Sequence, residues 1–275
     1  MGLKKLTKKE ISNMTVTELV GFTDELNKPP GGIKTLNKII LNAHINSSTK
    51  FLEIGCTTGF SSVEIKRLTN ADVYGIDIDK NSLEKAKARS LAEGLKINFM
   101  LADATKLPFK NNSFDVVFCS NVTSFIKDKE AALFNYKRVL KTYGFLVAVP
   151  IYYLKRPPKE LLNKVSKEIG NKIEYFTKQD WLNFFEDKTL ELFYYEDFKY
   201  KIRTVKEIKE YVEQNYMKKP EVLKLSDNLK LALYNKYVSQ LSIFNENLSY
   251  AGSSILIYRK VPETYEKELF PSVYD

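Results

Sequence analysis

The stretch Phe51-Leu-Glu-Ile-Gly-Cys-Thr-Thr-Gly59 carries the residues of this chain that are best suited to chemistry. An apolar run ends in an acidic residue, a loop with glycines follows, and a segment compatible with a helix, Phe60 to Leu68, comes next. This order predicts a strand, a tight loop and a helix, where backbone N–H groups at the start of the helix can meet a nucleotide-like ligand. The glycine spacing fits G-x-G-x-G better than the dinucleotide pattern G-x-G-x-x-G. By itself, such a loop is equally compatible with an ordinary strand-to-helix turn.

Two aspartates at later strand ends favour the ligand-binding interpretation. Asp77 ends the next apolar run, 22 residues after Gly55. An acidic residue about 20 positions beyond such a loop can accept hydrogen bonds from ribose hydroxyls. Asp103 follows a third run, where a carboxylate could accept from an adenine amine. Each aspartate alone is compatible with a turn or a helix cap, but acidic residues at three successive strand ends are hard to explain as caps.

Alternating strands and helices must position these residues. Continuous apolar runs such as Phe114–Phe118 are typical of parallel strands that are covered on both faces. Repeated units of this kind predict an α/β fold with a doubly wound sheet. The expected strands are Lys50–Ile54, Asp72–Ile76, Ile97–Leu101, Phe114–Cys119 and Gly144–Pro150, and the expected helices between them are Ser61–Leu68, Asn81–Glu93 and Lys129–Leu140.

The flanking segments are expected to be mainly helical. Residues 8–48 contain a capping-box pattern at Thr15 to Glu18 and a turn at Pro29-Pro30-Gly31-Gly32. Beyond Pro150 we expect helices at 159–169 and 177–186, a strand at 189–199, a helix capped by Thr204, one or two helices in 221–244, and a last strand at 253–258. The expected organisation is a helical lid in 1–48, the α/β domain in 49–260 with helical insertions near 155–188 and 201–250, and a tail in 261–275.

Composition excludes several classes of protein. No stretch approaches the roughly 18–20 apolar residues of a membrane span. Cys56 and Cys119 give no disulfide framework, which favours a cytoplasmic protein. The net charge of +9 comes from lysines scattered among glutamates, so solvated helix faces explain it better than a nucleic-acid footprint. No Cys/His spacing indicates a metal site, and the single His44 lies in the N-terminal helical segment.

Taken together, these motifs resemble the class I S-adenosylmethionine-dependent methyltransferases, especially the small-molecule branch that includes the ubiquinone and menaquinone methyltransferases. The resemblance covers residues 49–150 and, more weakly, 253–260. Besides the glycine loop, it is carried by Gly75-Ile-Asp-Ile-Asp79, Ala102–Phe109, Ser113–Phe118 and Arg138–Phe145. It implies a Rossmann-like seven-stranded sheet whose last strand is antiparallel, with a helical cap. Thr57 departs from the pattern, because the family has glycine there.

The resemblance also assigns cofactor contacts for S-adenosylmethionine and its product, S-adenosylhomocysteine. It implies that the glycine loop wraps the methionine moiety, Asp77 holds the ribose, Asp103 and its neighbour bind the adenine, and the residues after the fourth strand face the substrate. The cofactor-binding residues implied in this way are Glu53, Gly55, Cys56, Gly59, Asp77, Ile78, Asp103, Ala104, Ser120 and Asn121.

The implied reaction is in-line transfer of a methyl group to a small-molecule acceptor. A sulfonium is an excellent leaving group, so a general base is optional, and Tyr152 and Tyr153 are only weak candidates. Ser120-Asn-Val-Thr123 differs from the Asn/Asp-Pro-Pro-Tyr/Phe motif of enzymes that methylate nucleic-acid bases. An RNA or protein methyltransferase and a non-catalytic cofactor-binding domain are the alternatives. The acceptor, the methylated atom and the oligomeric state, monomer or homodimer, stay open.

Overall fold

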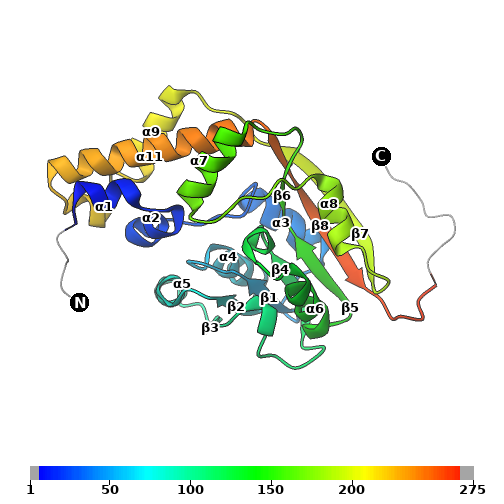
Figure 1. Cartoon of the computed structure of the whole chain (residues 1–275). Coiled ribbons are helices and arrows are strands. Elements are labelled where there is room, and N and C mark those ends of the chain that lie inside the picture. Colours follow the sequence, from blue (N-terminus) through cyan, green and yellow to red (C-terminus); the bar gives the residue numbers. More distant parts are fainter. Residues whose placement is uncertain (1–5, 267–275) are drawn as a thin grey trace.

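The five parallel strands expected from the sequence form the first part of one sheet. The computed structural model describes residues 6–266 (Figure 1). The sheet order is β3-β2-β1-β4-β5-β8-β6, and β7 pairs with the other edge of β8. The parallel strands are β1 (Lys50–Ile54), β2 (Asp72–Asp77), β3 (Asn98–Leu101), β4 (Phe114–Cys119) and β5 (Leu140–Ala148).

The last strands confirm the expected antiparallel end of the sheet. β8 (Ala251–Lys260) runs antiparallel both to β5 and to β7 (Leu190–Lys199). The eighth strand, β6 (Ile151–Tyr153), pairs with the start of β8 and continues the line of β5 beyond Pro150. Proline has no N–H to donate, so the ladder is interrupted there. The sheet is therefore the expected seven-stranded one with a short extension.

Strand β1 lies at the point where the order of the sheet reverses. It pairs with β2 on one side and with β4 on the other, and Glu53 is opposite Gly75 and Phe118. In an open α/β sheet, ligands bind outside the carboxyl ends of the strands at such a switch point. The loop after β1 is therefore in the position that a cofactor site requires.

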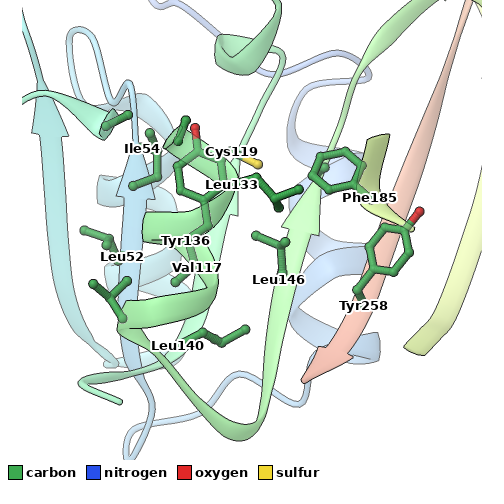
Figure 2. Packing of buried hydrophobic residues seen from close by; sticks show 14 of the residues in the cluster. Leu52, Ile54, Val117, Cys119, Leu133, Tyr136, Leu140, Leu146, Phe185 and Tyr258 are labelled. Carbon is green, nitrogen blue, oxygen red and sulfur yellow. The ribbon is translucent and has the colours of Figure 1, made fainter. Parts of the chain in front are cut away.

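Within the described residues, five helices cover the two faces of the sheet. α3 (Ile33–Asn42), α4 (Phe60–Thr69) and α5 (Lys80–Ala92) lie on one face, and α6 (Lys129–Val139) and α8 (Lys178–Phe185) lie on the other. Figure 2 shows Leu133 and Tyr136 of α6 packed on Leu52, Val117 and Leu146 of the sheet. α5 begins earlier than expected, because the Asp79 carboxylate accepts a hydrogen bond from the N–H of Ser82 and caps the helix.

The described part of the chain has six further helices, which form a separate layer with its own core. They gather at the end of the sheet toward which β5 points (Figure 1). Ile11, Leu19, Val212, Tyr216 and Leu233 belong to the buried cluster that joins all of these helices except the one at Lys159–Ile169, which packs beside the others. This helical layer consists of α1 (Lys8–Asn13), α2 (Val16–Thr23), α7 (Lys159–Ile169), α9 (Val205–Asn215), α10 (Pro220–Leu223) and α11 (Asp227–Leu248).

The helices expected in the two insertions, near 155–188 and 201–250, do not all belong to the helical layer. α7 packs beside α11, whereas the Trp181 and Phe185 rings of α8 belong to the core on the sheet. The expected capping boxes are present, since Thr15 and Thr204 bond the backbone of Glu18 and Glu207. Within residues 6–266, no helix combines the length and apolar character needed to cross a bilayer. The expected tail, 261–275, lies largely outside the described residues.

Candidate cofactor site

The loop between β1 and α4 makes two turns that glycine permits. Gly55 has a φ of 69° and Gly59 a φ of 80°. A Cβ on Gly55 would lie 2.5 Å from Cγ2 of Val122, and a Cβ on Gly59 would lie 2.8 Å from Cβ of Ala86. Both positions therefore combine left-handed backbone with close packing, and neither leaves room for a side chain.

Thr57 also adopts left-handed backbone, with a φ of 43°. Such a conformation costs a threonine roughly 1–3 kcal/mol, so its surroundings must hold it in place. Its N–H donates to Oδ2 of Asp77 (2.9 Å), and its Oγ1 accepts from Nδ2 of Asn27 (3.2 Å). A glycine here would keep the first bond and lose the second. The departure at position 57 is thus explained by a contact with the N-terminal segment.

Asp77, at the carboxyl end of β2, is held by two backbone donors. Its side chain accepts the N–H of Thr57 at Oδ2 and the N–H of Asp79 at Oδ1 (2.9 Å each). Burial raises the pKa of this carboxyl, although the two N–H donors oppose the effect. Each carboxylate oxygen can accept a second hydrogen bond. Next to it the Ile78 side chain is 77% exposed, which leaves a free apolar surface beside Asp77.

Glu53 lies under the loop and is almost completely buried, with 4% of its surface exposed. Its Oε2 accepts a hydrogen bond from the Ser62 hydroxyl (2.5 Å). Burial raises the pKa of the Glu53 carboxyl to about 7, against the opposing effect of Ser62. Near neutral pH this group is therefore divided between its charged and its neutral form.

The other predicted residue of the loop, Cys56, turns its side chain into the protein. The thiol is buried with Leu83, Ala86 and Phe99, and burial raises its pKa well above the ordinary value. The N–H of Cys56 donates to the carbonyl of Ile76 (2.9 Å). Only the backbone of Cys56 can contribute to a ligand site on the outer side of the loop.

Asp103 is exposed and serves as a cap. Its Oδ1 accepts from both the N–H and the hydroxyl of Thr105 (2.8 Å each), and these bonds lower the pKa of the carboxyl. They fix the 3-10 turn Ala104–Lys106, in which Ala104 is buried. One oxygen of Asp103 therefore caps the turn, as the turn interpretation predicts, and the other oxygen takes no part in the turn.

Ser120 and Asn121 directly follow β4 and are half-buried. Asn121 has a φ of 51°, and its side-chain oxygen accepts from the Ser124 hydroxyl (2.9 Å) and the N–H of Ile151 (3.1 Å). It braces the loop after β4 against β6. The next residue, Val122, is the one that presses on Gly55, so this brace also fixes the glycine loop.

Tyr152 and Tyr153 are both buried, and their hydroxyls are engaged. The Tyr152 hydroxyl lies 3.0 Å from the Ser254 hydroxyl, which donates to Asp197. The Tyr153 hydroxyl donates to the side-chain oxygen of Asn247 (3.0 Å). Burial raises the pKa of both phenols. His44 lies apart from the loop and packs its ring against Phe145 and Phe193.

The N-terminal segment supplies site residues that the sequence motifs did not reveal. Besides Asn27, the carbonyl of Glu25 accepts the Thr58 hydroxyl (3.0 Å). Arg89 of α5 bonds the carbonyl of Thr58 and the Asp24 carboxylate. The only sequence feature near these residues was the turn at 29–32, which marks where the N-terminal segment leaves the glycine loop. A hollow of about 270 Å³ beside Phe134 and another of about 440 Å³ beside Lys236 lie away from the loop.

Comparison with known proteins relates the segment around the glycine loop to a known family. Residues 52–148 match the family model described as a methyltransferase domain. An uncharacterized protein of Haemophilus influenzae is 31% identical over 162 residues, which are 58% of this chain and 64% of that protein. A sterol 24-C-methyltransferase of Gibberella zeae is 34% identical over 105 residues, 38% of this chain and 28% of that enzyme. The chain spans less than two thirds of the length of these relatives.

Solved structures extend the similarity to most of the fold. The MccD protein superimposes with a TM-score of 0.74 at 25% identity, covering 85% of this chain and 100% of that one. A phosphoethanolamine N-methyltransferase of Haemonchus contortus, solved with phosphomonomethylethanolamine and S-adenosylhomocysteine, gives 0.68 at 19% identity, covering 94% of this chain and 58% of that one. The latter supports the fold alone. The strand order, the glycine loop and the matched segment agree, and residues 52–148 of this chain form a methyltransferase domain.

Proposed function

We propose that the protein transfers a methyl group from S-adenosylmethionine to a small-molecule acceptor. The observation that carries this proposal is the arrangement of Asp77, whose two oxygens are aimed by backbone N–H groups beside a glycine loop. This is the chemistry that ribose hydroxyls require at the switch point of the sheet. The matched methyltransferase domain supports the same conclusion.

The residues around the loop fit the cofactor. Gly55 and Gly59 carry no side chains and Cys56 turns its own inward, so the loop presents backbone to a ligand, and the exposed Ile78 suits one face of an adenine. We assign Glu53 to the amino group of the methionine moiety, Asp77 to the ribose, and the unused oxygen of Asp103 to the adenine. The further contacts that we assign are Ala104, at the edge of the adenine, and Ser120 and Asn121, beside the methionine moiety.

The chemistry that the cofactor supplies when bound is a methyl group on a sulfonium, which an acceptor lone pair takes in line while the sulfur keeps the bonding electrons. The residues of this chain then bind, orient and exclude water, which can account for most of the rate enhancement. We assign no general base. The Tyr153 hydroxyl donates its proton to Asn247, the Tyr152 hydroxyl is hydrogen-bonded to Ser254, and burial raises the pKa of both phenols.

We further propose that the helical layer closes over the acceptor. Residues 24–27 rest on the glycine loop through Thr57 and Thr58, so that the segment acts as a lid beside the cofactor. A closed site of this kind suits a small molecule better than RNA or a protein chain. The relatives named for sterols and for phosphoethanolamine act on small molecules, in agreement with this choice. The free, buried cysteines agree with a cytoplasmic enzyme.

A transfer assay tests the proposal and its alternatives together. The protein is incubated with methyl-labelled S-adenosylmethionine and, separately, with the small-molecule, RNA and protein fractions of a cell extract. We expect label in the small-molecule fraction, and we expect Asp77→Ala to abolish it. Label confined to RNA or protein would overturn the choice of acceptor. No label in any fraction, with cofactor binding intact, would identify a non-catalytic domain.

A further inference from the structure

The lid places one acidic side chain at the boundary between the glycine loop and the helical layer. The carbonyl of Glu25 is tied to Thr58, and two residues later Asn27 is tied to Thr57. Arg89 holds both Thr58 and Asp24, so the lid is fixed to the loop and to α5 on either side of Glu25. The position of Glu25 is therefore determined by the cofactor loop itself.

The Glu25 carboxylate enters an aromatic surrounding. The Tyr216 hydroxyl donates to its Oε1 (2.6 Å), and Tyr216 is only 4% exposed. The Tyr216 ring is stacked on Tyr237 with centroids 4.2 Å apart, and its edge meets Tyr211 at 5.6 Å. Tyr237 covers one face of Tyr216, whereas Tyr211 is half exposed, so a cationic group here would meet the carboxylate together with the Tyr211 ring. A carboxylate and an aromatic ring can bind an ammonium group through charge and cation–π attraction together.

Within residues 6–266, no cation pairs with this carboxylate. Lys219 is the charge that acts on it most, but the Lys219 ammonium donates to the carbonyl of Asp24 (3.1 Å). Arg89 pairs with Asp24 rather than with Glu25. Burial raises the pKa of Glu25. Glu25 is thus a half-buried carboxylate whose nearest cation acts from a distance and forms no ion pair with it, which leaves the carboxylate able to take a cationic ligand.

We propose that Glu25 is a specificity-determining residue that receives a cationic group, a protonated or quaternary amine, on the methyl acceptor. This inference rests on the proposed function and names the class of substrate. Tyr216 positions the carboxylate, and the rings of the helical layer cover the rest of the cation. The cofactor contacts are assigned to other carboxylates, Glu53 and Asp77, so Glu25 is left for the acceptor.

Pairs of ligands that differ in charge but hardly in shape test this proposal. Choline and its neutral isostere 3,3-dimethylbutan-1-ol are titrated by calorimetry into the full chain saturated with S-adenosylhomocysteine, followed by methylammonium and ethanolamine. We expect at least one cation to bind about tenfold or more tightly than its neutral analogue. Glu25→Gln should abolish this preference. Asp24→Asn, the adjacent exposed carboxylate, should keep it, and Tyr216→Phe should weaken it.

The outcomes separate this inference from the proposed function. If S-adenosylhomocysteine does not bind the wild-type chain, the proposed function fails before Glu25 is tested. If it binds, and no cation shows a preference that depends on Glu25, the inference is overturned. It is also overturned if Glu25→Gln weakens S-adenosylhomocysteine itself by the same factor, because the carboxylate then serves the cofactor. A cooperative thermal transition that lies above the titration temperature shows that each variant is folded.

Discussion

Asp77 and Glu25 are two carboxylates beside the same glycine loop. Asp77 ends a strand of the sheet, and Glu25 lies in the segment that follows α2 and contacts the helical layer. Backbone N–H groups hold both oxygens of Asp77, whereas a tyrosine side chain holds one oxygen of Glu25. Backbone donors are set by the fold and survive substitution of their own side chains. A phenol donor disappears with one mutation. The sheet thus suits a constant ligand, and the helical layer can change its ligand by changing side chains.

The segment that matches the methyltransferase domain model also separates the sheet from the helical layer. The methyltransferase domain model covers residues 52–148 and stops before the insertions. The lid and the helical layer lie outside it. If function divides as structure does, substitutions on the sheet side will affect folding and cofactor binding most, and substitutions in the helical layer will have smaller effects on stability.

The largest effect on stability is expected from Glu53 and depends on pH. The pKa of its carboxyl is about 7 in the folded protein, above the ordinary value of 4.5. Between these values the folded chain holds a proton that the unfolded chain has lost, so stability falls as the pH rises. A shift of this size corresponds to roughly 3 kcal/mol. Glu53→Gln should remove most of the fall in the free energy of unfolding between about pH 5 and about pH 8.

Glu84→Gln, on the exposed surface of α5, is the matched control for that experiment. It should retain the wild-type pH dependence in chemical denaturation. If Glu53→Gln also retains it, the buried carboxyl is not the source of the effect.

Gly59→Ala should have the next largest effect. The new methyl group would meet Ala86 at 2.8 Å, and the φ of 80° disfavours alanine. We expect a loss of about 2 kcal/mol in the free energy of unfolding, from strain and overpacking together. Gly94→Ala has a similar φ of 66° but open space around it, so it should lose only about half as much. Equal losses would show that the close approach of α5 is unimportant.

Tyr216→Phe probes the helical layer. It removes the side-chain hydrogen bond that Glu25 accepts, and a bond of this kind, with a buried donor and a half-buried acceptor, contributes about 1–2 kcal/mol. The stability loss should therefore be smaller than that of Gly59→Ala. Tyr211→Phe, on a half-exposed side chain, should change little. A loss from Tyr216→Phe larger than from Gly59→Ala would break the comparison between the two regions.

The smallest effect is expected from Asp24→Asn. Asp24 pairs with Arg89 at 3.0 Å, but its side chain is half exposed. Exposed ion pairs contribute less than about 1 kcal/mol. Unfolding experiments should find that the stability of the variant is close to that of the wild type, and added salt should not enlarge the difference between them. A larger loss would mean that the lid depends on this pair rather than on Glu25 and Asn27.

The sheet and the cofactor loop could be predicted because their signals are local. Gly55, Gly59 and Asp77 are recognisable from spacing, and parallel strands bring their carboxyl ends to one edge without further information. The assignment of the individual site residues stays a prediction. The contacts of Thr57 show where spacing is insufficient, since its partner Asn27 is 30 residues away.

The Glu25 subsite could not be predicted, because it depends on tertiary contacts between distant segments. Glu25 and Tyr216 are 191 residues apart, and neither stands in a motif. The same limit applies to Cys56, whose side chain turns inward because Leu83, Ala86 and Phe99 form a pocket there. Asp103 combines a predictable and an unpredictable feature. Its capping of Thr105 is a local interaction that the sequence indicates, whereas the role of its free oxygen depends on a ligand.

The central claim, that the Asp77 end of the sheet binds S-adenosylmethionine, is tested most directly by calorimetry with S-adenosylhomocysteine. The wild-type chain should bind it, and Asp77→Asn should bind about tenfold to a hundredfold more weakly, since the charged acceptor is lost. Asp72→Asn, at the exposed opposite end of the same strand, should bind like wild type. Absence of binding at millimolar concentration, or equal affinity of the wild-type and Asp77→Asn chains, would contradict the claim.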